Sequence, residues 1–224
     1  MFEKIKFDQL YHAFSLIFSS NMSGFLRGHS CCTALLKMSE DWRSSLDNKQ
    51  DVAVVTVDLS KAFDSICHNL LLAKLKAYGL NKPAVDLIRS YLQDRKQRVK
   101  CNNVFSDWRP SKCGVPQGSL LGPLLFNVFI NDLNEMITIS SLRLYADDTT
   151  NYTSDDCPVR LELAINNDIT SLGHWLNINF LTLNPKKTQA MIMGNSKYDY
   201  EIRVNNLLIS SENNLKILGV IYFR

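Results

Sequence analysis

Residues 144–150 read LYADDTT, which places Asp147 and Asp148 side by side in a turn between apolar segments. A third carboxylate, Asp58, closes the separate apolar run VAVVTVD of residues 52–58. Adjacent negative charges at a strand end repel one another, and a bound cation offsets that repulsion. Three carboxylates brought together can hold two divalent metals, so the pattern predicts two-metal phosphoryl transfer. For Asp148 alone, a solvated turn aspartate is an equally good explanation.

The composition fits one domain with subdomains. The chain has 224 residues, of which 46% are hydrophobic, enough for a self-sufficient core. Its 25 Lys and Arg against 22 Asp and Glu give a net charge of +3, which is too small to require a polyanionic partner by itself. Residues 1–21 carry early charges and a broken apolar stretch, unlike a signal peptide or a spanning helix. We expect a soluble, intracellular protein without a membrane partner.

The six cysteines are scattered and form no C-x-x-C pair, so reduced, partly buried thiols are expected. His29 lies close in sequence to Cys31 and Cys32, but no second ligand pair follows at the spacing that zinc sites use. The pattern therefore does not favour a zinc site.

Hydrophobic periodicity and turn residues predict an alternation of helices and strands. Helices are expected from Ser30 or Thr33 through Leu46, at 69–78 (ended by Gly79), at 83–94, at 120–134 and from Pro158 through Leu176. Strands are expected at 52–57, 141–145, 149–153, 189–193, 201–204, 207–209 and 216–222, and a hairpin at 95–109 with its turn near Asn102 and Asn103. This order indicates an α+β fold, an antiparallel sheet with helices on one face, in which Asp58 comes to lie beside the Asp147 turn.

Several longer motifs occur in a fixed order along the chain. They are VVTVDLSKAFDSICHNLLLAKL (54–75), CGVPQGSLLGPLLFNVFINDL (113–133), LYADDTT (144–150), LNPKKTQAMIMG (183–194) and LKILGVIY (215–222). In this order they resemble reverse-transcriptase motifs A to E, and the resemblance is nearest to non-LTR retrotransposons of the jockey-like group. SGFLRGHSCCTALL (23–36) resembles an additional fingers motif of that group. The resemblance covers nearly the whole chain.

The resemblance implies a right-hand polymerase palm with partial fingers and without a thumb. Residues 1–50 would be partial fingers, and residues 51–224 the palm, with inserted fingers elements near 80–115. It also implies RNA-directed DNA synthesis, with dNTP, an RNA template and a DNA primer as partners. Asp58, Asp147 and Asp148 would bind two Mg²⁺ ions, with Mn²⁺ as a substitute, because hard cations prefer oxygen ligands. Asp58 and Asp147 are the favoured bridging ligands, and Asp148 is the weaker third.

Further roles follow from the resemblance at matching positions. Phe63 resembles the aromatic steric gate that excludes a 2′-hydroxyl; otherwise it is an ordinary core phenylalanine. Gln117 and Gly118 match the loop that touches the incoming nucleotide and template, where glycine permits close backbone approach. A plain turn before a helix is the alternative for these two residues.

Two further motifs concern the leaving group and the primer. Lys187 matches a lysine proposed to protonate or neutralise the departing pyrophosphate, and an exposed surface lysine is the alternative. Leu218 and Gly219 resemble the primer grip, a short hairpin under the primer end; without the resemblance they read as core strand.

Basic residues alternate along the first strand of the 95–109 hairpin. Lys96, Arg98 and Lys100 would share one face. They could contact nucleic-acid phosphates, in which case binding would weaken with salt. A solvated edge strand is the alternative.

The chain also departs from the family pattern. The fingers segment that supplies a triphosphate-binding arginine would lie before residue 1, and Arg27 belongs to a different motif, so that role is not carried over to Arg27. A thumb would follow Arg224. We therefore keep two hypotheses, an RNA-directed DNA polymerase fragment and a truncated, inactive retroelement remnant that binds nucleic acid weakly. An RNA-dependent RNA polymerase is disfavoured by Phe63, since such an enzyme must accommodate the 2′-hydroxyl.

Overall fold

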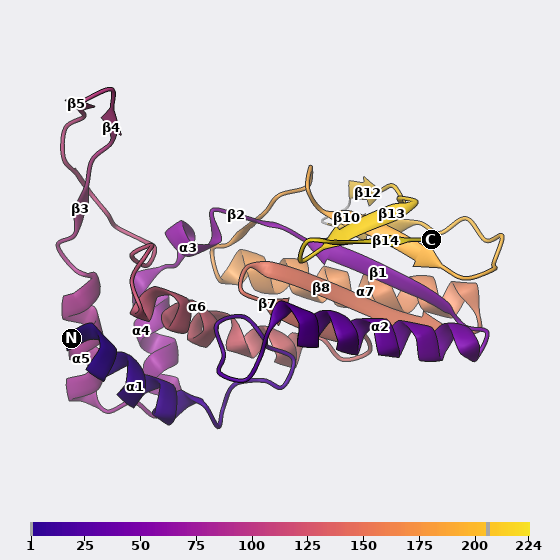
Figure 1. The fold of residues 1–224 in the computed structure, drawn as a ribbon, viewed down its shortest axis with the longest axis horizontal. Helices are drawn as coiled ribbons and strands as arrows, with labels where there is room; N and C mark the ends of the chain where they lie inside the picture. The colour runs from indigo at the N-terminus through magenta and orange to yellow at the C-terminus, as the bar shows by residue number, and fades with distance from the viewer. Residues whose placement is uncertain (1, 205–206) are drawn as a thin grey trace.

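A four-stranded antiparallel sheet forms the centre of the part of the chain that the computed structural model describes, residues 2–204 and 207–224 (Figure 1). Its strand order is β10-β1-β8-β7. The strands are β1 (Asp51–Val57), β7 (Ser141–Tyr145), β8 (Asp148–Asp155) and β10 (Gln189–Met193). All four lie where the sequence predicts them, and β1 is almost wholly buried, as expected for an apolar run with sheet neighbours on both sides.

Two helices cover one face of this sheet. They are α6 (Leu121–Ile130) and α7 (Pro158–Ile178), and they share a core cluster with alternate residues of β1. Pro158 opens α7, because proline at the first turn lacks only a donor that would be unpaired there. The predicted apolar stripe of α7 is fully buried at Leu161, Ile165, Ile169, Leu172 and Leu176.

The opposite face of the sheet is also covered by a helix. The expectation that helices pack on one face only is therefore wrong. Helix α2 (Cys31–Asp47) lies there, opened by the predicted Ser30 cap, which accepts a hydrogen bond from the Thr33 backbone nitrogen. Met38 and Trp42 of α2 pack in a second core cluster with the other set of β1 side chains. The reason is that α2 buries a stripe of its own, which needs a second apolar surface.

A hairpin of β13 (Asn214–Ile217) and β14 (Val220–Phe223) joins that second cluster. The prediction of one strand over 216–222 is therefore wrong. Leu218 and Gly219 both have positive φ angles, +47° and +88°, and form the two-residue turn between the strands. Apolar residues continue on both sides of the turn and include Leu218 itself, which explains why the sequence pattern looks like a single strand.

Three helices gather beyond one end of the sheet: α1 (Phe2–Phe14), α4 (His68–Ala77) and α5 (Lys82–Leu92) (Figure 1). Gly79 ends the α4 segment with a φ of +94°, as predicted.

The remaining elements of the body are short. They are α3 (Ala62–Ser65), the 3₁₀ helix η1 (Asn131–Met136), β2 (Leu59–Ser60) paired with β9 (Thr182–Leu183), and β11 (Ile202–Val204) paired with β12 (Leu207–Ile209).

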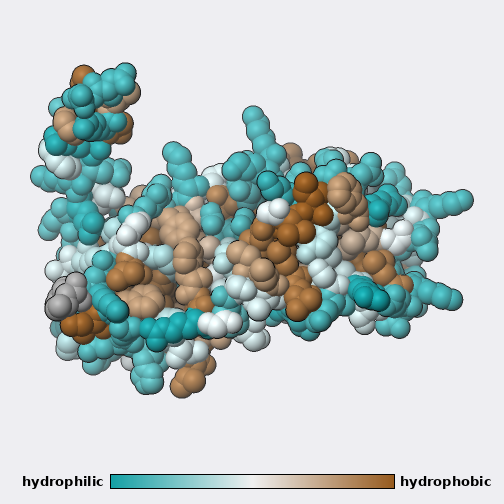
Figure 2. All heavy atoms as spheres, in the orientation of Figure 1, coloured by the Kyte–Doolittle hydropathy of each residue, from teal (hydrophilic) through white to brown (hydrophobic). Residues whose placement is uncertain are grey.

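The predicted 95–109 hairpin projects from this helical end as an arm (Figure 1). We call residues 95–112 the arm; it contains β3 (Lys96–Gln97), β4 (Lys100–Cys101), β5 (Val104–Phe105) and β6 (Arg109–Pro110). Asn102 and Asn103 form its turn, with φ angles of +45° and +64°. Hydrophilic residues cover most of its surface (Figure 2). Among the described residues, no helix combines the length and the apolar character needed to cross a bilayer.

Candidate active site

Asp58 and Asp148 lie at the same end of two neighbouring strands. Val57 of β1 pairs with Thr149 of β8 in an antiparallel ladder, so continuing the register by one residue sets Asp58 opposite Asp148. The Asn184 backbone nitrogen donates a hydrogen bond to the Asp58 carbonyl oxygen, 2.8 Å away, which fixes the chain just beyond β1. The sheet thus brings together two carboxylates that are distant in sequence, as predicted.

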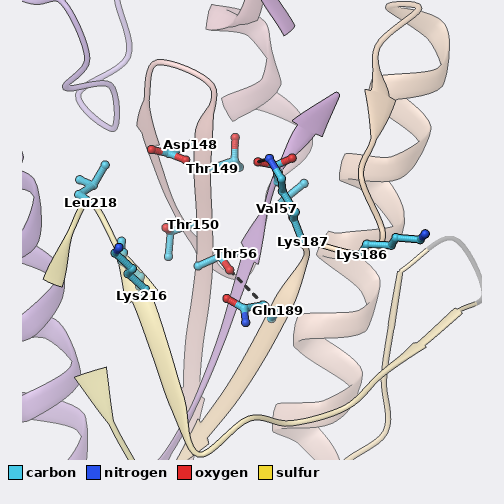
Figure 3. Close-up of a pocket in the computed structure, with 12 residues that line it drawn as sticks. Thr56, Val57, Asp148, Thr149, Thr150, Lys186, Lys187, Gln189, Lys216 and Leu218 are labelled. Carbon is cyan, nitrogen blue, oxygen red and sulfur yellow. Dashed lines mark hydrogen bonds and ion pairs between the residues drawn. The ribbon is translucent and has the colours of Figure 1, made fainter. Parts of the chain in front are cut away.

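A pocket of about 360 Å³ opens at this strand end (Figure 3). Four of the predicted site residues line it: Asp58, Asp148, Lys187 and Leu218. Sequence reasoning missed the other polar lining residues, namely Thr56, Thr149, Thr150, Lys186, Gln189 and Lys216. The sequence does contain a signal for Lys216. It lies between Leu215 and Ile217, which are buried, so on a strand its side chain must point away from the core.

The carboxylates of the pocket lie close to other charged groups, both negative and positive. Partial burial raises the pKa of the Asp148 carboxyl, and the negative charges of Asp147 and Asp58 raise it further, against the lowering effect of Lys187. Lys187 Nζ lies 3.5 Å from Asp58 Oδ1 in an ion pair. The carboxylates therefore repel one another, and a cation bound between them would relieve that repulsion.

Asp147 lies in the turn that joins β7 to β8. The turn is tight, since Tyr145 pairs directly with Asp148 and only Ala146 and Asp147 lie between them. Ala146 has a φ of +56°, a conformation that residues with a side chain adopt rarely and that is frequent at functional sites. The turn holds Asp147 next to Asp148 but outside the residues that line the pocket.

The donor set suits a hard divalent cation, since carboxylate oxygens are the ligands that Mg²⁺ and Mn²⁺ prefer. The mutual repulsion felt by Asp148 also fits a cation site. Within residues 2–204 and 207–224, however, no three acidic, histidine or cysteine side chains are gathered closely enough to form a ready-made metal cage. The carboxylates would have to draw together around the ions.

Phe63 lies on α3, is half buried and contacts two other aromatic rings. Its ring stacks on Phe126 of α6, with the centroids 4.4 Å apart and the planes at 23°. Phe25 meets the same ring edge-on at 6.3 Å and 89°. Phe63 is not among the residues that line the carboxylate pocket.

Gln117 lines a second pocket, of about 400 Å³, together with Lys96 at the base of the arm. Its Nε2 atom donates a hydrogen bond to Asp64 Oδ1, 3.0 Å away. Gly118 follows with a φ of +77°, in open space. The structure therefore separates this loop and Lys96 from the carboxylate pocket.

The other two basic residues of the predicted nucleic-acid face lie farther out on the arm and are exposed. The Arg98 guanidinium carbon is 3.9 Å from the centre of the Phe105 ring and 4.5 Å from that of Trp108. Lys100 Nζ is 5.5 Å from the Phe105 ring centre. These cation–π contacts organise the exposed face.

Comparison with known proteins identifies the family. A family model described as "Reverse transcriptase (RNA-dependent DNA polymerase)" matches residues 2–222. The chain belongs to the reverse transcriptase family. The match includes Asp58, Asp147 and Asp148, the arm, and the β13–β14 hairpin as far as residue 222.

Its relatives include polymerases of non-LTR retrotransposons. A probable RNA-directed DNA polymerase from transposon BS of Drosophila melanogaster is 32% identical over 179 residues, which cover 77% of this chain and 20% of the relative. The RNA-directed DNA polymerase from mobile element jockey of Drosophila funebris is 28% identical over 209 residues, 90% of this chain and 23% of the relative. The chain thus spans about a fifth of the length of these relatives.

Solved structures of telomerase share the fold. A Candida albicans telomerase in complex with a fragment of telomeric RNA superposes with a TM-score of 0.63 at 13% identity, covering 99% of this chain and 37% of that one. A Candida tropicalis telomerase gives a TM-score of 0.65 at 14% identity, with coverages of 95% and 35%. The α+β, right-hand polymerase architecture expected from the sequence is therefore confirmed.

Proposed function

We propose that this reverse transcriptase domain takes part in RNA-directed DNA synthesis, in which a primer 3′-hydroxyl attacks a dNTP. The observation that carries the proposal is the position of Asp58 opposite Asp148 at the end of β1 and β8, in a pocket that also contains Lys187. Two carboxylates from neighbouring strands, with Asp147 in the adjoining turn, are the ligand set that two-metal nucleotidyl transfer requires.

Asp58, Asp147 and Asp148 would hold the two ions, Mg²⁺ or Mn²⁺. When bound, such ions activate the attacking oxygen and neutralise charge on the phosphoryl group. Lys187 is exposed and pairs with Asp58, so it can move toward a phosphate when that pairing weakens. There it would neutralise or protonate the departing pyrophosphate.

The remaining predicted residues would bind substrates. Phe63 would stack under the incoming sugar and exclude a 2′-hydroxyl, while Gln117 and Gly118 would contact the nucleotide and template. Leu218 and Gly219, at the tip of the β13–β14 hairpin, would support the primer end, and Leu218 already lines the carboxylate pocket.

The arm would bind the nucleic acid backbone through Lys96, Arg98 and Lys100. Its exposure and its projection from the body support this role (Figure 1). In the corresponding division of the chain, residues 1–50 would belong to the fingers and residues 51–224 to the palm, with inserted fingers elements near 80–115.

A second candidate function is nucleic-acid binding without catalysis. It is favoured by the absence of a ready-made metal cage in the described residues and by the pairing of Asp58 with Lys187. In this case the basic arm would still bind RNA, while the carboxylates would not gather around metal ions.

Primer extension distinguishes the two candidates. The purified chain is incubated with an RNA template, a DNA primer, dNTPs and Mg²⁺, beside Asp58→Asn, Asp147→Asn and the matched control Asp47→Asn. Asp47 is an exposed carboxylate at the end of α2. We expect extension by the wild type and the Asp47 variant only. If the wild type extends the primer no more than Asp147→Asn does, while still binding RNA, the result would contradict polymerase activity and support the second candidate.

A further inference from the structure

Residues 21–25 continue the central sheet beyond β7. The Ser23 backbone nitrogen donates to the Leu144 carbonyl oxygen at 2.8 Å, and the Leu144 nitrogen donates to the Asn21 carbonyl oxygen at 2.9 Å. Met22 forms a parallel bridge with Leu144. This segment therefore runs along the strand that leads into the Ala146–Asp147 turn, and its position is fixed by backbone hydrogen bonds.

Gly24 then passes directly against that turn. A Cβ atom on Gly24 would overlap the Ala146 backbone nitrogen and stand 2.9 Å from the Tyr145 carbonyl carbon. The Gly24 carbonyl oxygen accepts a buried hydrogen bond of 2.7 Å from Asn127 Nδ2 on α6. The segment is thus held between the carboxylate turn and the helix that carries Phe126.

Phe25 follows in a conformation that a bulky residue rarely adopts, with a φ of +58°. Its side chain is 55% exposed, so burial of its own ring does not explain this backbone geometry. What the geometry achieves is an edge-on contact with Phe63, whose ring also stacks on that of Phe126. Unusual backbone conformations of this kind are concentrated where a site needs a side chain in one position.

We propose that Phe25 is a positioning residue for sugar discrimination. This inference rests on the proposed role of Phe63 as the steric gate. By this contact Phe25 restricts the positions that the Phe63 ring can adopt while it stacks on Phe126. Because Gly24 contacts the Ala146–Asp147 turn, the same segment ties the position of the gate ring to the position of the carboxylates. A 2′-hydroxyl that pushes against Phe63 would meet a ring held by two aromatic contacts.

The test compares Phe25→Ala with Phe25→Tyr, which keeps an aromatic edge, and with Phe180→Ala. Phe180 is a matched control, since it has the same φ of +58° and an exposed side chain but lies at the end of α7. The measured quantity is the ratio of kcat/KM for dATP to that for ATP on one RNA template. An edge-on aromatic pair of this kind predicts a fall of roughly threefold to tenfold in that ratio for Phe25→Ala.

Phe25→Tyr and Phe180→Ala should keep the wild-type ratio. An unchanged ratio in Phe25→Ala, beside a reduced ratio in Phe63→Ala, would overturn the inference while leaving the polymerase proposal intact. If the wild type incorporates no nucleotide, the polymerase proposal fails, and the positioning role is then judged from the aromatic NMR signal of Phe63. That signal should change in Phe25→Ala and not in Phe180→Ala; an unchanged signal would overturn the inference independently.

Discussion

Gly24 and Ala146 are in such close backbone contact that no side chain fits between them. The Cβ atom introduced by Gly24→Ala would meet main-chain atoms of Tyr145 and Ala146, which cannot rotate aside as a flexible side chain can. We expect this substitution to displace the carboxylate turn and to lower kcat for primer extension by at least about tenfold, because misplacing a catalytic group by about 1 Å has effects of this size or larger. Circular dichroism checks that the chain remains folded.

Gly28→Ala is the matched control for that variant. Unlike Gly24, Gly28 has a positive φ, +80°, but nothing lies within 4 Å of the position its Cβ would take. The Gly28→Ala variant should be less stable by about 1 kcal/mol because of backbone strain, and it should retain the wild-type kcat. Equal losses of kcat in both variants would show that strain in the segment, and not contact with the turn, explains the effect.

Asp148→Asn should stabilise the metal-free protein at pH 7 while abolishing activity. The pKa of Asp148 is raised in the folded state by partial burial and by Asp147 and Asp58. Between its unfolded and folded pKa values the folded state binds more protons, so stability falls as pH rises through that window and stays reduced above it. The asparagine has no such penalty.

Thermal melts in EDTA at several pH values measure this effect. The Tm advantage of Asp148→Asn should be present at neutral pH and shrink as acid protonates Asp148 in the wild type. Added Mg²⁺ should raise the Tm of the wild type more than that of the variant. An advantage that is constant with pH would contradict the repulsion, and Asp47→Asn gives the baseline for an exposed carboxylate.

Lys187→Met should tighten Mg²⁺ binding and slow catalysis. The Lys187 ammonium lies 3.5 Å from Asp58 Oδ1, so it competes with a metal ion for that oxygen. The proposed role at the leaving pyrophosphate would be lost, and general acid groups typically contribute about a hundredfold or more. Titration of Mg²⁺ in the primer-extension assay gives both the apparent metal affinity and kcat.

Lys186→Met is the control for this change. Lys186 lines the same pocket, but its side chain extends away from Asp148 (Figure 3). Removing it subtracts the same charge without removing the ion pair to Asp58. If both variants tightened Mg²⁺ binding equally, general electrostatic attraction would account for the result and the competition at Asp58 would not.

The strands that carry the carboxylates could be predicted from sequence because each is a local pattern. The apolar run before Asp58 and the paired aspartates of the LYADDTT stretch need only periodicity and turn preferences. The segment around Gly24 could not be assigned in this way. Its position depends on a bridge between Met22 and Leu144, and a contact between residues so distant leaves no trace in local periodicity.

The turn at Leu218 shows a different limit. Leu218 interrupts a strand-like alternation with a φ of +47°, a conformation that leucine rarely adopts. Local propensity therefore favours a continuous strand, and the packing of the hairpin against Trp42 and its neighbours on α2 overrides that preference. Placement of Lys216 in the carboxylate pocket follows from the same packing.

Replacing Lys96, Arg98 and Lys100 with alanine should reduce the salt dependence of RNA binding. If each cation contacts one phosphate, the slope of log K against log salt concentration should fall in magnitude by roughly 2 to 3. Fluorescence anisotropy at several salt concentrations measures that slope. The control removes the same charge elsewhere, by substitution of the exposed residues Arg43, Lys76 and Lys82. An identical slope change in both variants would indicate a net-charge effect without specific contacts by the arm.

Asn151→Leu should stabilise the fold. Asn151 of β8 is fully buried, and neither polar atom of its side chain has a hydrogen-bond partner among the described residues. A buried amide of this kind costs about 1–3 kcal/mol, a cost that an apolar side chain of similar volume avoids. We expect a gain of about 1–2 kcal/mol, seen as a rise in Tm of roughly 2–8 °C for a chain of this length.

The opposite sign is expected for the same substitution at Asn127, which provides the contrast. Asn127 is equally buried, but its Nδ2 atom donates to the Gly24 carbonyl oxygen. Asn127→Leu leaves that oxygen without its partner inside the protein, so it should lower Tm and loosen the segment against the Ala146 turn. A loss of stability in Asn151→Leu would mean that its amide is satisfied by a buried water, whose release the leucine would force.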